Sequence, residues 1–350
     1  MTRASTLARD LAAVFALLIA YATLYPLTGW RDQGLSPLAW AGTWPKVSLP
    51  VDFTFNLLAY IPLGMLLVWS CFPHLRGVLS TMVALVLGAA LSFLLESLQT
   101  YLPTRVPALT DLLANSIGSL AGGVLGALLA PGLLERGMLK ATTDRWVGAH
   151  TPRGLILAGL WLFAALYPQG MLFGFGGLQA VLGTVSGYPF TPAEFARVET
   201  SVTAASLFAA GSLFLVSLTR QAPRFVLMLV FVGLACAVRA LSHTVLFSPE
   251  VALAWLTPGA QNGLMAGTAA LLFALALPRA MLLALVLIAV TFATVVVNLA
   301  PANPYYAAIV QSLSPGRFLN FNGLTQTVAA LWPFVAALYV LFALPARESR

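Results

Sequence analysis

Long runs of apolar residues, separated by short polar or proline-containing segments, occupy most of the chain. A membrane-spanning helix needs about 20 mostly apolar residues. Ten runs meet this requirement, and Pro, Gly or charged residues separate most of them. The predicted spans are 10–29, 53–72, 77–101, 109–130, 154–175, 200–219, 224–247, 259–277, 280–300 and 323–344. The pattern therefore predicts an all-α polytopic transmembrane bundle of about ten spans.

The composition agrees with a membrane protein. Of the 350 residues, 60% are hydrophobic and 8% are charged, whereas about 25% charged residues is typical of a soluble domain. The surface of such a chain is expected to contact membrane lipids. The formal net charge is +7, but no basic run is present that would follow a phosphate backbone, so we expect no nucleic-acid partner.

The distribution of basic residues predicts the orientation of the bundle. If the N-terminus is inside, twelve Lys and Arg residues fall in inner segments and five in outer loops, and Arg239 alone lies inside a span. Cytoplasmic loops carry the excess of basic residues. Both termini are therefore predicted to be cytoplasmic.

The N-terminal segment also fits a second interpretation. Arg3 and Arg9, a short apolar run and then Ala20-Tyr21-Ala22 resemble a cleavable signal peptide. The apolar run continues to Leu27, which favours an uncleaved first span. Cleavage would leave the later topology unchanged.

The longest charged stretch, residues 131–153, marks the predicted domain boundary. We divide the chain into a domain of about four spans, residues 1–135, and a second domain of about six spans and unknown role, residues 136–350. The stretch itself fits either an interfacial amphipathic helix, with apolar side chains against lipid, or a solvated linker.

Seven polar residues interrupt the apolar spans of the first domain, and the predicted topology brings them to one membrane face. They are Asp52, Asn56, Glu96, Gln99, Arg105, Asp111 and Asn115. Within each span the carboxylate and the amide are three or four residues apart and share a helix face. The pattern predicts an outward-facing ligand-binding site built from these seven residues.

A purely structural role is the alternative for these residues. Asp52 and Asp111 are placed to cap helix N-termini, and amides commonly form hydrogen bonds between membrane helices. Glu96 is different, because it lies near the C-terminal end of its span, where the helix dipole disfavours an anion. A charge within a span costs at least ~2.5 kcal/mol. Glu96 is therefore expected to be protonated, paired with Arg105 or hydrated, and each of these conditions points to a site.

Small residues indicate how the helices approach one another. Gly118, Gly122 and Gly126 recur every four residues, which predicts a seam where another helix backbone packs closely. Pro62 and Gly64 are expected to kink or loosen the second span and to free a carbonyl group facing the bundle.

Three segments carry a family resemblance. The stretches "VDFTFNLLAYIPLG", "LLESLQTYLPTR" and "TDLLANSIGSLAGG" resemble the VanZ-like family over roughly residues 10–130. The resemblance implies a protein of the bacterial cytoplasmic membrane with a link to the cell envelope, because the family's namesake is associated with low-level resistance to teicoplanin. It implies no particular reaction, and this chain adds about six spans to the pattern of the short family members.

The second domain contains few charges within its spans. Arg239 and His243 are four residues apart on one span, and Arg239 is expected to pair with Glu199 or with a backbone carbonyl, or to serve a functional site. Asn322 and Gln326 are further secondary candidates on the predicted outer side. They fall in residues 298–326, which we interpret as either an ordinary outer loop or a lid.

Metal and cofactor chemistry have little support in the sequence. Cys71 and Cys236 lie far apart in apolar runs, and no two of the three histidines are within helical reach of each other. We predict no metal site, and the sequence leaves any cofactor unknown.

Three functions remain open. The first is a binding protein that recognises a cell-envelope precursor or a lipid headgroup. The second is an enzyme that acts on a lipid-linked or phosphate-bearing substrate, although neither a nucleophile motif nor a dense acidic motif is present. The third is a secondary transporter or flippase, for which an inverted repeat is not evident.

Overall fold

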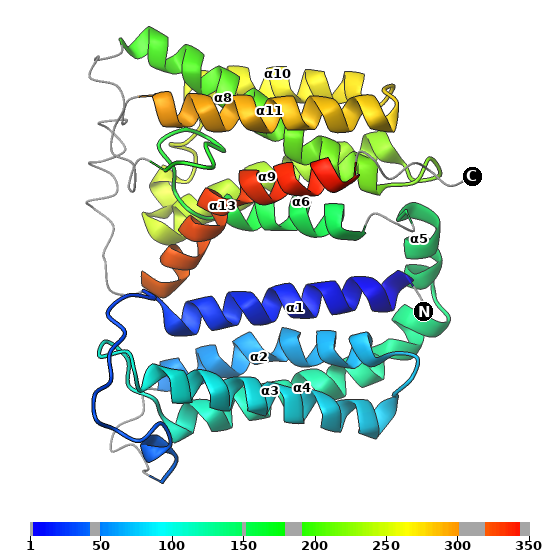
Figure 1. The fold of residues 1–350 in the computed structure, drawn as a ribbon. Helices are drawn as coiled ribbons and strands as arrows, with labels where there is room; N and C mark the ends of the chain where they lie inside the picture. Colours follow the sequence, from blue (N-terminus) through cyan, green and yellow to red (C-terminus); the bar gives the residue numbers. More distant parts are fainter. Residues whose placement is uncertain (1–2, 43–49, 149–151, 179–190, 301–318, 344–350) are drawn as a thin grey trace. The chain divides into compact units, whose positions relative to one another are not determined.

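The structure is a computed structural model that describes residues 3–42, 50–148, 152–178, 191–300 and 319–343. Helices form all the regular structure of these residues (Figure 1). Packing divides the chain into two compact units, residues 1–152 and 153–350. The division falls at the end of the polar stretch 131–153. Separate roles for residues 1–135 and 136–350 stay a prediction.

Four long helices form unit 1 in its described residues. They are α1 (Arg3–Leu24), α2 (Pro50–Cys71), α3 (Gly77–Gln99) and α4 (Leu109–Ala130). The shorter elements are η1 (Ala39–Gly42), η2 (Pro131–Glu135) and α5 (Met138–Trp146). The stretch after α4 is therefore largely helical, as the amphipathic interpretation expects, while its position at a membrane interface stays a prediction.

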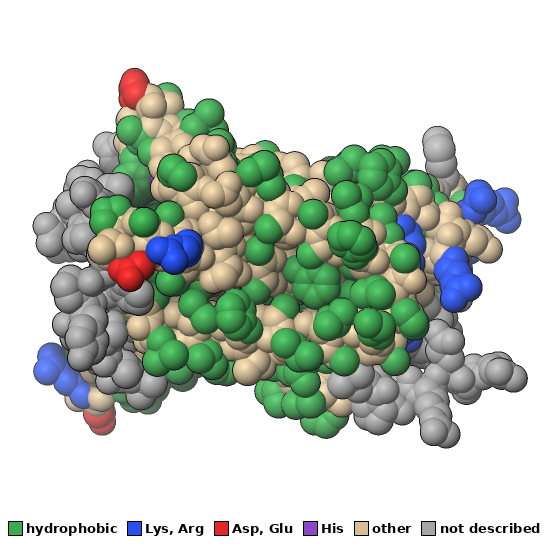
Figure 2. Space-filling view, turned by 90° about the horizontal axis from the view of Figure 1, so that it is seen from above, with side chains coloured by type: hydrophobic (Ala, Val, Ile, Leu, Met, Phe, Trp, Pro, Cys, Tyr) green, Lys and Arg blue, Asp and Glu red, His purple; other side chains and the backbone are tan. Residues whose placement is uncertain are grey.

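Unit 2 contains one short helix, α6 (Pro152–Ala164), and five longer ones among its described residues. The longer helices are α8 (Pro192–Ser217), α9 (Arg224–Leu246), α10 (Pro258–Ala274), α11 (Arg279–Leu299) and α13 (Leu319–Ala343). A short turn of helix, η3 (Pro249–Val251), follows α9. Figure 2 shows one face of the molecule with hydrophobic side chains across its middle and charged side chains toward its ends, as expected for a surface that meets lipid.

Eight of the described helices are long and apolar enough to cross a membrane. The other two predicted spans correspond to shorter helices: α10 has 17 residues, and α6 has 13 residues. A helix of this second length extends only about 20 Å, whereas the apolar core of a bilayer is about 30 Å thick. The prediction of a continuous helix over 154–175 is therefore wrong in its second half. The chain is a multi-pass membrane protein, and its span count and orientation stay predictions.

The buried face of α4 in unit 1 consists mainly of small and polar residues rather than large apolar ones. The buried face of α4 includes Asn115, Gly118, Ser119 and Gly122, while Leu128 on the opposite face is 72% exposed. Large apolar side chains face outward because lipid, unlike water, does not drive them inward. Close packing of helix backbones takes the place of large apolar side chains along this face of α4, while a separate apolar cluster of unit 1 includes Ile19, Leu63 and Leu95.

The predicted glycine seam is confirmed. Gly118, Gly122 and Gly126 lie against the α2 backbone at Leu57, Ile61 and Met65 respectively. A Cβ atom at Gly122 would lie only 2.0 Å from the carbonyl oxygen of Ile61. Trp69 adds a cross-helix bond, because its Nε1 donates to the Gly126 carbonyl at 2.9 Å. Helix α2 continues through Pro62 without interruption.

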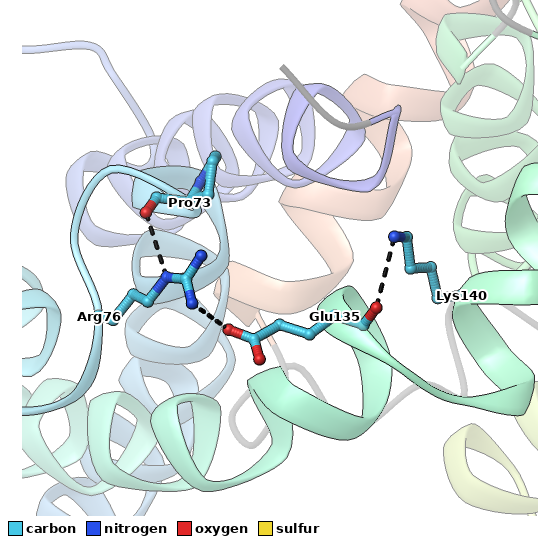
Figure 3. A network of polar contacts seen from close by, with 4 residues as sticks. All are labelled: Pro73, Arg76, Glu135 and Lys140. Carbon is cyan, nitrogen blue, oxygen red and sulfur yellow. Dashed lines mark hydrogen bonds and ion pairs between the residues drawn. The ribbon is translucent and has the colours of Figure 1, made fainter.

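A polar network fixes the end of unit 1 where α2 ends, α3 begins and α4 ends (Figure 3). Arg76 Nη1 lies 2.6 Å from Glu135 Oε1, and Arg76 Nε donates to the Pro73 carbonyl at 3.3 Å. Lys140 donates to the Glu135 carbonyl at 3.4 Å. The helices are therefore antiparallel neighbours, and the starts of α2 and α4 meet the end of α3 at the opposite end of the unit.

Candidate functional site

Glu96 is buried near the end of α3 and caps the next helix. Its side chain is 2% exposed, and its Oε2 accepts a hydrogen bond from the backbone N–H of Ala108 at 3.0 Å. Ala108 is the N-cap residue of α4, and its own side chain supplies no cap. Glu96 thus satisfies one of the N–H groups that a helix start leaves without a partner.

Gln99 and Arg105 both form hydrogen bonds with backbone carbonyls at or just after the end of α1. Gln99 Nε2 donates to the Thr23 carbonyl at 3.1 Å. Arg105 donates through Nε at 2.9 Å to the Tyr25 carbonyl, which also accepts a bond from Nη2. Partial burial lowers the pKa of Arg105. No ion pair joins Arg105 to Glu96, so the pairing considered from sequence is not formed.

Asp52, Asn56 and Asp111 form what we call the acidic end of unit 1. The Asp111 carboxylate interacts with the Asn56 side chain and, electrostatically, with Asp52. Asp52 is exposed, while Asn56 and Asp111 are half-buried. No described Lys or Arg forms an ion pair with either carboxylate. The structure therefore brings two carboxylates and an amide together without a described cation to neutralise them.

Below the acidic end lies a buried group that we call the inner cluster, formed by Tyr60, Ser92 and Asn115. Asn115 Nδ2 donates to Ser92 Oγ at 2.9 Å. The Tyr60 hydroxyl lies toward Ser92 and near Glu96, but it makes no hydrogen bond of acceptable geometry with the described residues. All three side chains are at most 5% exposed.

Sequence reasoning placed Asn115 in the site but missed Tyr60 and Ser92. A signal was present, because Asp52 and Asn56 continue at the same four-residue spacing to Tyr60. Glu96 continues in the same way to Ser92, and a four-residue step on one helix keeps side chains on one face. Ser and Tyr are common in membrane helices, so only this four-residue spacing distinguishes Tyr60 and Ser92 from other Tyr and Ser residues of the chain.

Arg239 in unit 2 satisfies backbone carbonyls. The guanidinium donates to the carbonyls of Tyr167 at 2.7 Å, Ala165 at 3.4 Å and Gln169 at 3.4 Å. These carbonyls lie just beyond α6, where residues 165–178 are not helical and are largely buried. Irregular backbone at membrane depth needs such partners. Arg239 therefore pairs with backbone carbonyls, as one interpretation of the sequence expected, and it also interacts electrostatically with Glu199. A functional role for Arg239 stays a prediction.

Other buried polar residues of unit 2 support the same irregular segment or a helix start. Thr203 Oγ1 donates to the Leu172 carbonyl at 3.0 Å, and Asn298 Nδ2 donates to the Gly176 carbonyl at 2.8 Å. Glu199, 4% exposed, accepts a bond from Thr257. Thr257 in turn caps α10 through the Ala260 N–H. The roles of Thr203 and Asn298 were not predicted from the sequence, because their partners lie in or next to a segment that the apolar pattern predicted to be helical.

The remaining secondary candidates do not form a defined group. His243 is 7% exposed, and its Nε2 has no hydrogen-bond partner within the described part of the chain. Asn322 is half-buried near the start of α13, and Gln326 is exposed one turn later. Residues 301–318 of the proposed lid lie outside the described residues. Functional roles for these positions stay predictions.

The described residues contain no group of three or more His, Cys, Asp or Glu side chains arranged to hold a metal ion. Asp52, Asp111 and Glu96 come from three helices at one end of unit 1, but they do not form such a group. The arrangement is suited instead to accepting hydrogen bonds.

Comparison with known proteins supports the family resemblance for one part of the chain. Residues 12–130 match the VanZ/LLP1 family, which confirms the resemblance read from residues 10–130. The matched segment contains most of α1 and all of α2, α3 and α4, so it includes all seven predicted site residues. Comparison with curated proteins and with solved structures finds no match. The chain is thus a multi-pass membrane protein with a VanZ/LLP1-like segment.

Proposed function

We propose that this protein resides in the bacterial cytoplasmic membrane and binds the headgroup of an envelope lipid or envelope precursor at the acidic end of unit 1. The headgroup is one that donates hydrogen bonds, through an amine or through hydroxyl groups. The observation that carries the proposal is the interaction of Asp111 with the Asn56 side chain and, electrostatically, with Asp52, while no described Lys or Arg forms an ion pair with either carboxylate.

The negative charge of the acidic end determines which lipid headgroups it favours. A carboxylate accepts hydrogen bonds and donates none, so two carboxylates favour an ammonium or hydroxyl group over a bare phosphate. Arg105 is the basic residue among the seven candidates, and its Nε and Nη2 already donate to the Tyr25 carbonyl. Asn56 supplies both donor and acceptor atoms beside the two acids.

Two lipids of equal charge test this proposal. Phosphatidylethanolamine carries an ammonium group that donates hydrogen bonds, whereas the trimethylated headgroup of phosphatidylcholine donates none. Hydrogen bonds to charged groups contribute about 1.5–3 kcal/mol, so we expect the full-length protein to prefer phosphatidylethanolamine about tenfold or more. Native mass spectrometry of the detergent-purified protein measures the preference.

The variants Asp52→Asn and Asp111→Asn should reduce this preference, because each removes a negative charge and keeps the size of the side chain. Glu250→Gln is the matched control, since Glu250 is an exposed acid in unit 2. Equal binding of the two lipids by the unmodified protein would contradict the proposal. So would a preference that Asp52→Asn and Asp111→Asn leave intact.

The resemblance to VanZ-like proteins supports a role at the cell envelope, which we propose includes a low level of protection against teicoplanin. Expression of the protein in a susceptible bacterium should raise the inhibitory concentration of teicoplanin. Asp111→Asn, expressed to the same level, should lose this effect, whereas Glu250→Gln should keep it. An equal effect of the unmodified protein and Asp111→Asn would separate the resistance role from the acidic end.

Transport of lipid is a second candidate function, favoured by the short helix α6 of unit 2 and the irregular backbone that follows it. Discontinuous helices line the substrate path of many secondary transporters, and α6 gives way to buried irregular backbone at residue 165. Proteoliposomes that contain fluorescent phosphatidylethanolamine provide the test. Movement of the lipid between leaflets, above that of protein-free liposomes, would favour transport over binding alone.

A further inference from the structure

The inner cluster contains buried polar atoms that the described residues leave without partners. They are the Tyr60 hydroxyl and Asn115 Oδ1, and Ser119 Oγ lies without a partner one turn further along α4. Tyr60 is 2% exposed, Asn115 5% and Ser119 0%. Buried polar groups are almost always hydrogen-bonded, so several orphaned atoms in one place point to a bound polar group.

The chemistry of these atoms is specific. The Tyr60 hydroxyl can donate a hydrogen bond, and Asn115 Oδ1 can only accept one, because the amide nitrogen of Asn115 is directed to Ser92. A hydroxyl group accepts and donates at once and therefore matches both. An ammonium group can donate to Asn115 Oδ1 and to the Tyr60 oxygen but offers no acceptor for the Tyr60 proton, whereas a phosphate accepts from Tyr60 and offers no donor to Asn115 Oδ1.

The position of the cluster connects it to the acidic end. Asp52, Asn56 and Tyr60 follow one another at four-residue intervals on α2, and Asp52 and Tyr60 are separated by about 12 Å along the helix axis. Burial increases along this line, from exposed Asp52 through half-buried Asn56 to Tyr60. On α4 the same order holds from half-buried Asp111 to buried Asn115.

We propose that Tyr60, Ser92 and Asn115 form an inner subsite that binds a hydroxyl group of a polyol or sugar headgroup whose outer part lies at Asp52 and Asp111. This inference rests on the proposed function and narrows it, since it assigns the ligand a hydroxyl-bearing headgroup. Water offers the same hydroxyl chemistry, and the experiment below distinguishes the two sources.

The test compares three neutral or zwitterionic lipids on the full-length protein in detergent by native mass spectrometry. Monoglucosyl-diacylglycerol presents hydroxyl groups, diacylglycerol lacks the sugar, and phosphatidylethanolamine reports on the acidic end alone. We expect the glucosyl lipid to bind more tightly than diacylglycerol. Tyr60→Phe removes only the hydroxyl and should weaken glucosyl-lipid binding about tenfold, with little change for phosphatidylethanolamine.

A stability measurement separates a ligand contact from a structural one. The Tyr60 hydroxyl has no described partner, so Tyr60→Phe should leave the thermal unfolding midpoint of the lipid-free protein unchanged or raised. Ser92→Ala provides a second variant with the same expected loss of glucosyl-lipid binding. Tyr339→Phe, on α13 of unit 2, is the matched control and should change neither measurement.

Two results would overturn the inference. Unchanged glucosyl-lipid binding by Tyr60→Phe and Ser92→Ala would remove the inner subsite for a lipid hydroxyl, and a lowered unfolding midpoint of Tyr60→Phe would then assign the cluster to water. No advantage of the glucosyl lipid over diacylglycerol would remove the hydroxyl-bearing ligand. In both cases the preference for phosphatidylethanolamine over phosphatidylcholine still decides the proposed function independently.

Discussion

Glu96 Oε2 accepts a hydrogen bond from the backbone N–H of Ala108 at 3.0 Å, so a buried acid at the end of α3 caps the start of α4. This contact spans the turn between the two helices and fixes the end of unit 1 at which Asp52, Asn56 and Asp111 lie. A residue whose position within a span points to function also has a structural role. Substitutions at Glu96 must therefore distinguish its functional role from its structural role.

Two substitutions at Glu96 are expected to differ. Gln retains an oxygen that can accept the Ala108 N–H, so Glu96→Gln should unfold at nearly the same temperature as the unmodified protein. Leu retains none, and loss of a helix cap costs about 0.5–2 kcal/mol, so Glu96→Leu should unfold at a lower temperature. Differential scanning fluorimetry of detergent-purified protein measures both midpoints.

The same pair tests the chemistry at Glu96. If Glu96→Gln keeps its fold and its lipid preference, proton transfer by this carboxyl group is not needed, as a binding protein requires. If Glu96→Gln keeps its fold but loses function, the enzyme and transporter interpretations gain support. Equal destabilisation by Gln and Leu would instead show that the carboxylate charge, and not only its hydrogen bond, stabilises the start of α4.

A larger residue in the glycine seam should weaken the close contact between α2 and α4. In Gly122→Ala the new Cβ would meet the Ile61 carbonyl oxygen at 2.0 Å, and backbone atoms cannot rotate away as a side chain can. We expect destabilisation of about 1–3 kcal/mol, typical of overpacking, and a lowered unfolding midpoint.

Gly233→Ala is the control for this prediction. Gly233 lies within α9, and a Cβ there would meet nothing within 4 Å. Since Ala is a better helix former than Gly by about 0.8–1 kcal/mol in water, this variant should be neutral or slightly more stable. A Gly122→Ala protein as stable as Gly233→Ala would mean that the two helices are not in close contact.

Unit 2 offers a test of its irregular segment. In Arg239→Leu the carbonyls of Ala165, Tyr167 and Gln169 lose a buried donor, and breaking a buried charged contact costs several kcal/mol. Arg239→Lys keeps the charge but cannot reach three carbonyls with a planar fork, so we expect an intermediate effect. Limited proteolysis near residues 165–178 should become faster in the order unmodified protein, Lys variant, Leu variant. Equal rates would contradict the supporting role of Arg239.

The elements that could be predicted from the sequence are those set by a regular period. Apolar runs of about 20 residues located helices α2, α3 and α4 to within a few residues, and a four-residue glycine spacing located the seam between α2 and α4. The polar residues of the acidic end followed from the predicted alternation of spans. In each case a regular repeat, either along one helix or in the alternating direction of successive spans, determines the result.

The parts that could not be predicted depend on irregular backbone. Residues 167–178, "YPQGMLFGFGGL", contain no charged residue and several large apolar ones, so the predicted span 154–175 runs into them. Pro168 and the glycines were the available signal that the helix ends. Because the segment is irregular, its carbonyls need donors from other helices. Arg239, Thr203 and Asn298 supply these donors, and hydropathy could not predict their roles because it does not reveal that the backbone is irregular.

Orientation across the membrane is the last prediction, and single cysteines test it. In a background without Cys71 and Cys236, we would place a cysteine at Asp52, which is exposed at the acidic end, or at Arg136, which is exposed at the opposite end of unit 1. The basic residues of the inner segments predict that a membrane-impermeant thiol reagent labels position 52 in intact cells. Position 136 should be labelled only after the membrane is permeabilised. The reverse pattern would place the acidic end in the cytoplasm, where an outer-leaflet headgroup cannot reach it, and the site would then have to bind a ligand of the inner leaflet.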